Sequence, residues 1–134
     1  MRVLLDTNVI VSAVTTRGLC ADVFRAVLAA HELVTCAQVL QEVRRILSMK
    51  FGFPEQLIAE YLELIGQEAI LAESEDLPDL PLQDRDDVEI VAAALSARAQ
   101  VLVTGDHDLQ SLKKVGEVRI ISPRAFWVEL TARE

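Results

Sequence analysis

Aromatic side chains are scarce in this chain, and other features that it lacks exclude several classes of protein. Only 4% of its 134 residues are Phe, Trp or Tyr, so we expect an aliphatic core. Two cysteines, Cys20 and Cys36, provide neither a disulfide framework nor a metal motif, and they are expected to be small buried hydrophobic residues. No apolar run reaches the roughly 20 residues needed to cross a bilayer. No signal peptide is visible, so we expect a cytoplasmic protein that is not bound to a membrane.

Positive charge is also in short supply. The chain has 13 Lys and Arg against 21 Asp and Glu, a net charge of −8, which by itself argues against a nucleic-acid binder. However, residues 73–89 hold eight acids and one base, Arg85, and so supply −7 of this total. The rest of the chain is nearly neutral, and bound divalent cations would offset more of the charge. An acidic total is therefore compatible with an RNA substrate.

Short apolar runs alternate with helical patterns along the whole chain, which predicts a parallel sheet covered by helices on both faces. The fold expected is a three-layer α/β sandwich with a central, mainly parallel five-stranded sheet, forming a single domain over residues 1–134. The predicted strands are 2–6, 33–36, 69–71, 101–104 and 118–121. The predicted helices are 8–14, 19–30, 37–50, 54–67, 86–98, 108–114 and one that opens at Ser122-Pro123.

Two of the predicted strands run directly into acids. Asp6 follows Val3-Leu4-Leu5, and Asp106 follows Val103-Thr104-Gly105. In open α/β sheets, ligands bind outside the carboxyl ends of the strands, so both acids are candidate functional residues. Asn8 is well placed to orient a carboxylate, and Thr104 to hydrogen-bond one. Asp108 is expected to be the N-cap of the following helix.

The other candidate acids lie in predicted helices. Glu42 falls at the margin of an apolar helix face, where a ligand role and a solvated acid paired with Arg45 are equally probable. Asp84, Asp86 and Asp87 cluster at one helix start, where Asp84 or Asp86 is placed to be the N-cap and helix-dipole effects explain two of the three. A third acid there is unfavourable unless a cation is near, and Asp87 should project toward the sheet end.

Four carboxylates that converge on one point repel each other, and a divalent metal is the usual remedy. Asp6, Glu42, Asp87 and Asp106 are the four candidates. Hard oxygen ligands of this kind suit Mg²⁺ or Mn²⁺, and a metal held by carboxylates points to phosphate chemistry.

With these residues assembled, the chain resembles the PIN-domain family over nearly its whole length. The similarity is carried by residues 3–9 (VLLDTNV), Glu42, residues 84–92 (DRDDVEIVA) and residues 103–109 (VTGDHDL). The resemblance implies a five-stranded parallel sheet and an acidic pocket that binds Mg²⁺ or Mn²⁺. It assigns that pocket to Asp6, Glu42, Asp106 and either Asp86 or Asp87; the spacing favours Asp87.

The resemblance also implies a metal-dependent endoribonuclease that is the toxin of a type II toxin–antitoxin pair. The implied partners are an RNA substrate, a small cognate antitoxin and a second copy in a homodimer, with Phe51, Phe53 and Trp127 as candidate contact residues. Arg85 is a candidate guide for the RNA backbone. The alternatives are a non-catalytic PIN-fold module for nucleic-acid binding or assembly and, more remotely, an aspartyl-phosphate phosphatase. The latter normally has a second Asp where Asn8 stands.

Overall fold

A six-stranded, mostly parallel sheet forms the centre of the molecule in a computed structural model that describes residues 1–74 and 76–132. Its strand order is β3-β2-β1-β4-β6-β5. The strands are β1 (Arg2–Leu5), β2 (Glu32–Cys36), β3 (Ile70–Ala72), β4 (Val101–Val103), β5 (Lys114–Val115) and β6 (Val118–Ile121). Every neighbouring pair is parallel except β5 with β6. The predicted three-layer α/β fold is confirmed.

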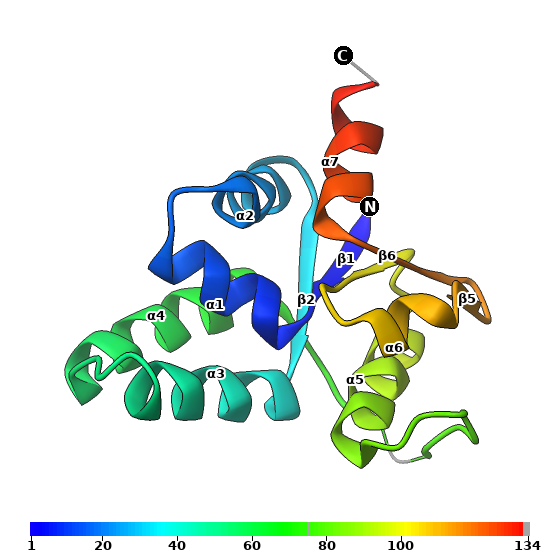
Figure 1. Ribbon diagram of the computed structural model, residues 1–134, viewed down its shortest axis with the longest axis horizontal. Coiled ribbons are helices and arrows are strands. Elements are labelled where there is room, and N and C mark those ends of the chain that lie inside the picture. The colour runs from blue at the N-terminus through cyan, green and yellow to red at the C-terminus, as the bar shows by residue number, and fades with distance from the viewer. Residues whose placement is uncertain (75, 133–134) are drawn as a thin grey trace.

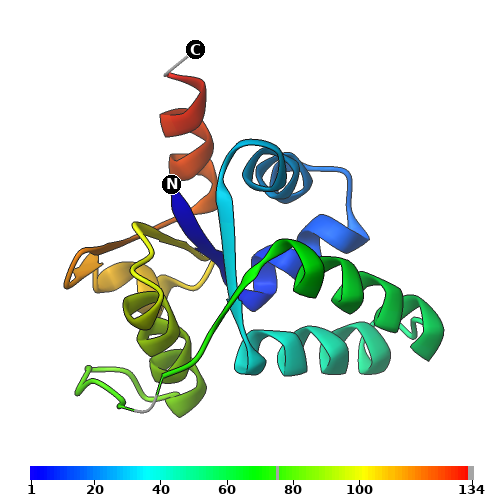
Figure 2. The ribbon, with the colours of Figure 1, turned by 180° about the vertical axis from the view of Figure 1, so that it is seen from behind.

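Helices cover both faces of this sheet. They are α1 (Thr7–Thr15), α2 (Leu19–Ala30), α3 (Ala37–Met49), α4 (Glu55–Glu68), α5 (Arg85–Ser96), α6 (His107–Ser111) and α7 (Pro123–Thr131). Figure 1 views the sheet nearly edge-on, with α1 to α4 on one side and α5 on the other, and Figure 2 shows the same layers from behind. Within the described residues, no helix combines the length and apolar character that a membrane span requires.

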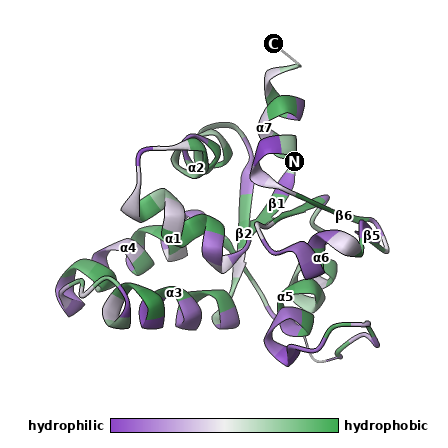
Figure 3. Ribbon diagram, viewed as in Figure 1, coloured by the Kyte–Doolittle hydropathy of each residue, from purple (hydrophilic) through white to green (hydrophobic). Residues whose placement is uncertain are grey.

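The core is aliphatic, as the scarcity of aromatic residues predicts. The runs Val3–Leu5 and Val101–Val103 are completely inaccessible to solvent, because a parallel strand flanked by helices is buried on both faces. Phe126 in α7 is the one aromatic side chain among the described residues that is fully buried. The helices are amphipathic by contrast: α3 alternates hydrophobic and hydrophilic residues along its ribbon (Figure 3).

The predicted strand count and one predicted helix were wrong in the same place. The helix expected over residues 108–114 is the short α6, and Lys114–Val115 form an extra antiparallel strand at the sheet edge. Lys113 leaves the helical conformation with a φ of +61°, and Gly116 follows with a φ of +56°. Val115 pairs with Val118, so Gly116 lies in the turn of a tight hairpin, where a positive φ suits glycine.

The direction of the strand order reverses between β1 and β4. The chain builds β2 and β3 on one side of β1, and α5 then carries it to β4 on the other side. Leu5 at the end of β1 pairs with Val103 at the end of β4. The segments that follow these two strands therefore leave the sheet side by side, at Asp6 and Thr104. This reversal is the topological switch point at which open α/β folds bind their ligands.

Candidate active site

Asp6 is the most firmly held of the candidate acids. It is the N-cap of α1 and only 4% exposed. Its Oδ1 accepts a hydrogen bond from the Thr7 backbone N–H at 2.8 Å, and its Oδ2 accepts from the Thr104 hydroxyl at 2.7 Å and the Asn8 amide at 3.1 Å. Both oxygens are thus satisfied by uncharged donors, which fixes the carboxylate in one orientation.

The turn after β4 is attached to Asp6 through Thr104 and Asn8. The buried Thr104 hydroxyl, which donates to Asp6, accepts from the Asp106 backbone N–H at 3.0 Å. Asn8 Oδ1 accepts from the Gly105 N–H at 3.0 Å. A Cβ on Gly105 would lie 3.3 Å from that oxygen, so this position favours glycine. The two strand ends are therefore joined into one polar unit.

Asp106, not the predicted Asp108, is the N-cap of α6. Its Oδ1 accepts from the Asp108 backbone N–H at 2.8 Å. The prediction for Asp108 was wrong because the helix begins one residue earlier, at His107. Asp108 is exposed, and its contacts within the described residues are made by its backbone: its N–H donates to Asp106, and its carbonyl accepts from the Ser111 hydroxyl at 2.6 Å. Asp106 thus stands at the end of β4 as Asp6 stands at the end of β1.

Glu42 points back from α3 toward the start of α1. Its Oε1 accepts from the Thr7 hydroxyl at 2.6 Å, and its Oε2 accepts from the Gln38 amide at 3.0 Å. The solvated ion pair with Arg45 is not formed, and the half-buried carboxylate instead contacts Thr7, the residue next to Asp6. Sequence reasoning missed Thr7 and Gln38, although a Gln four residues before a Glu on one helix is a recognisable hydrogen-bonding pair.

The first turn of α5 separates its three acids. Asp84 is the N-cap and accepts from the Asp86 N–H at 2.9 Å, and both of these residues are exposed. Asp87 is half-buried. Burial raises the pKa of Asp87 to about 7, and the negative charges of Asp84, Asp106, Asp6 and Glu42 add to that rise. Of the two alternatives for the third acid, Asp87 is the half-buried one on which the charges of the other acids act, whereas Asp86 is exposed.

Burial also raises the pKa of Asp6. Hydrogen bonds from Thr104 and Thr7 oppose this rise by favouring the charged form, whereas the charges of Glu42 and Asp106 add to it. The four predicted acids come from four separate segments, and the charges of Glu42 and Asp106 act on both Asp6 and Asp87. Such a cluster attracts a cation.

Carboxylate oxygens match Mg²⁺ or Mn²⁺ in chemistry and charge. As the side chains stand, however, no three Asp, Glu, His or Cys residues within 1–74 and 76–132 form a group that could hold a metal ion. Asp6, Glu42 and Asp106 are each turned toward their own neutral donors. The residues therefore suit a divalent cation, because they are oxygen donors and because a cation would relieve the repulsion between them. A bound ion would have to draw the carboxylates together.

Arg85, the candidate backbone guide, lies in the same turn of α5 as Asp87. Its side chain is 78% exposed, and its Nε lies 3.8 Å from Glu89 Oε1. Asp87 lies two residues from each partner and so projects from a different side of the helix. The guanidinium is therefore paired with Glu89 and open to solvent.

Fold and site together define an α/β protein with a carboxylate cluster at the switch point of a parallel sheet. The family model described as "PIN domain" matches residues 2–108, and the chain belongs to the PIN-domain family. No curated protein sequence matches the chain.

Two solved structures share the fold. One is VapBC2 from Rickettsia felis bound to a DNA fragment from its promoter, with a TM-score of 0.63 and 15% identity over 91% of this chain and 98% of the other. The second is VapBC-1 from nontypeable Haemophilus influenzae, with a TM-score of 0.59 and 19% identity over 92% of this chain and 99% of the other.

Proposed function

We propose that this PIN-domain protein is a metal-dependent endoribonuclease. The observation that carries the proposal is the gathering of four acids around the switch point, with Asp87 raised to a pKa of about 7 by burial and by its acidic neighbours. A site that disfavours its own negative charge in this way suits a divalent cation and, with it, a phosphodiester. A network this acidic would repel RNA without such a cation.

Asp6, Asp87, Asp106 and Glu42 would hold Mg²⁺ or Mn²⁺. When bound, the cation supplies positive charge that stabilises the developing charge on the phosphate and acidifies water. Thr104 and Asn8 hold the Asp6 carboxylate in place, so little reorganisation is needed there. Thr7 and Gln38 aim Glu42, which is suited to accept a proton from the water that attacks phosphorus as the P–O bond to the leaving strand breaks.

The test is cleavage of labelled single-stranded RNA in Mg²⁺. Asp6→Asn and Asp87→Asn are each expected to lose at least about 100-fold in rate, because they remove a charge that acts on the transition state. Glu60→Gln, on the exposed surface of α4, is the matched control and should cleave like the wild type. Equal cleavage by Asp6→Asn and wild type would refute the assignment. Mn²⁺ binding without any turnover would instead favour the non-catalytic module.

A toxin role is part of the same proposal, with a small antitoxin as the partner. Its support is the similarity in fold to the two structures named VapBC. Of the candidate contact residues, Phe53 and Trp127 pack against the core, whereas Phe51 is 41% exposed. Phe51 borders a cavity of about 390 Å³ between α1 and α3 that is also lined by Asn8 of the acidic site. An antitoxin segment seated there would reach the acids.

Expression of the chain alone should arrest bacterial growth, and Asp6→Asn should abolish the arrest. Co-expression of the short reading frame next to its gene should restore growth and yield a complex in which Phe51→Asp weakens binding. Sedimentation of the purified chain tests the proposed homodimer. Arrest that survives Asp6→Asn would contradict a toxin that acts through RNA cleavage.

A further inference from the structure

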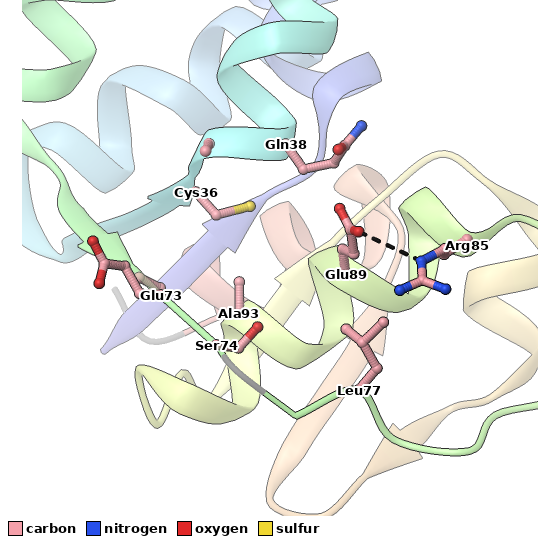
Figure 4. Close-up of a pocket in the computed structure, with 10 residues that line it drawn as sticks. Cys36, Gln38, Glu73, Ser74, Leu77, Arg85, Glu89 and Ala93 are labelled. Carbon is pink, nitrogen blue, oxygen red and sulfur yellow. Dashed lines mark ion pairs between the residues drawn. The ribbon is translucent and has the colours of Figure 1, made fainter.

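A second cavity, of about 410 Å³, lies against the acidic site without including any of its four acids. Cys36 and Gln38, from the end of β2 and the start of α3, form one side, and Arg85, Glu89 and Ala93 of α5 form the other (Figure 4). Glu73, Ser74 and Leu77 of the segment after β3 close the lower edge. The cavity is thus bordered by three separate parts of the chain.

The cavity and the acidic site share a wall. Gln38 lines the cavity and donates its amide to Glu42 at 3.0 Å. Cys36 lies on the same wall, and the charges of Glu42 and Asp6 contribute to the raised pKa of its thiol, after burial as the main cause. On the opposite wall, Glu89 lies two residues from Asp87 in α5 and so projects from a different side of that helix. The contact of Gln38 with Glu42 is therefore what places a group in this cavity next to a phosphate held by the acids.

The lining shows what kind of group would fit. Its charged residues are Glu73, Glu89 and Arg85, a formal balance of −1, and Arg85 is already paired with Glu89. A second phosphate is disfavoured by this balance. Small apolar side chains form much of the remaining surface: Cys36, Ala37, Ala72, Leu77 and Ala93. An uncharged group that donates hydrogen bonds at its edge suits this lining, and the volume lies within the usual range for small-ligand sites.

We propose that this cavity binds one base of the RNA strand, adjacent to the phosphate that is cleaved, and that it prefers guanine. The inference rests on the proposed ribonuclease function. Guanine presents a ring N–H and an exocyclic amino group side by side, which the Glu89 carboxylate can accept together. Uracil presents a single N–H between two carbonyls and offers no such pair. A base can enter only if it is unstacked, so the site also selects single-stranded RNA.

Binding of free nucleosides tests the cavity without catalysis. With ¹⁵N-labelled protein in EDTA, guanosine should shift the amide signals of Gln38, Glu89 and Ala93. Inosine, which lacks the exocyclic amino group, and uridine should bind about tenfold more weakly, the size of effect expected from a bidentate contact. Glu89→Gln should reduce guanosine affinity to the inosine level, whereas Glu60→Gln should not change it. Equal affinity for the three nucleosides, or no effect of Glu89→Gln, would overturn the proposal.

Cleavage provides the second measurement. Wild type should cleave an oligonucleotide with a single guanosine faster at that site than the same strand with inosine, and Glu89→Gln should cleave both at equal, slower rates. Asp6→Asn should stop cleavage of both strands and keep guanosine binding. Guanosine binding in a protein that cleaves no RNA would refute the nuclease and leave the base site standing. RNA cleavage with no base preference and no guanosine binding would refute the base site alone.

Discussion

The end of β1 and the first turn of α5 bring acids to the same place by opposite means. At the end of β1, Asp6 is nearly inaccessible and receives three hydrogen bonds from Thr7, Thr104 and Asn8. At the start of α5, Asp87 is half-buried, and no hydrogen bond from any described residue reaches its carboxylate. Asp87 is surrounded instead by the negative charges of other acids.

This difference indicates that Asp6 contributes to the stability of the fold, whereas Asp87 is suited to bind a cation. The Asp6 network is complete without a cation, so it contributes to folding by joining β1 to the turn after β4. Asp87 has no such compensation, because no described residue offsets its desolvation and its repulsion from other acids. We therefore expect variants at Asp6 partners to destabilise the fold, and variants at Asp87 to stabilise the metal-free protein.

The largest expected effect on stability is that of Thr104→Val. This change removes a buried hydroxyl that serves both Asp6 and the Asp106 N–H. It should lower the free energy of unfolding by about 2 kcal/mol, because buried polar groups lose their partners. Urea titration measures this loss. Thr131→Val, at an exposed helix end, is the control and should change stability by less than about 0.5 kcal/mol. A neutral Thr104→Val would mean that the Asp6 network does not support the fold.

Asp87→Asn should act in the opposite direction. The pKa of Asp87 is raised to about 7 in the folded protein, so the folded state holds its proton more tightly than the unfolded state. The contribution of Asp87 to metal-free stability should therefore be greatest below pH 4 and be lost as the pH rises through 7. At pH 8, Asp87→Asn should be more stable than wild type by about 1–2 kcal/mol, allowing for solvent screening.

This gain should largely disappear near pH 4, because the carboxyl is then neutral in the folded state and only about half ionised in the unfolded state, where its pKa is 3.8. Asp86→Asn, in the same helical turn but exposed, is the matched control and should show little pH dependence. Thermal unfolding of the three proteins across pH 4–8 in EDTA measures the difference. If the stabilities of wild type and Asp87→Asn changed by the same amount between pH 4 and pH 7, the raised pKa of Asp87 would be contradicted.

Mg²⁺ should reduce the difference in stability between wild type and Asp87→Asn. At a concentration five times its dissociation constant, it should stabilise the wild type at pH 8 by about 1 kcal/mol. The gain should be smaller at pH 5, because protons compete for Asp87. Differential scanning fluorimetry with and without Mg²⁺ measures the stabilisation at the two pH values. Asp87→Asn is expected to be stabilised less than wild type. An equal response of both proteins would place the cation elsewhere.

The smallest expected change in stability is that of Gln38→Met. It keeps the length of the side chain and removes the amide that holds Glu42, a loss of about 0.2–0.5 kcal/mol for a pair four residues apart on a helix. Its effect on kcat should exceed its effect on stability, since Glu42 loses its orientation. Gln67→Met, which removes a surface contact with Glu63, should alter neither. Unchanged kcat for Gln38→Met would exclude a positioning role.

The acids at strand ends could be predicted from local sequence, and Glu42 could not. Asp6 and Asp106 follow buried runs whose direction fixes where the chain leaves the sheet. Glu42 lies on a helix margin, and the same helical pattern suits a solvated acid equally well. Only the approach of α1 to α3 brings the Thr7 hydroxyl to within 2.6 Å of it. The extra strand β5 was missed because two residues are too few to show any periodicity.

The sequence by itself determined the fold class, the buried strands and the family, because these depend on the pattern of apolar residues and on short motifs along the chain. The tertiary structure decided which acids face one another, that Asp106 caps α6, and that a cavity adjoins Glu42 through Gln38. Charge repulsion and enclosure depend on distances between segments far apart in the chain, and those distances are set only when the sheet and helices pack together.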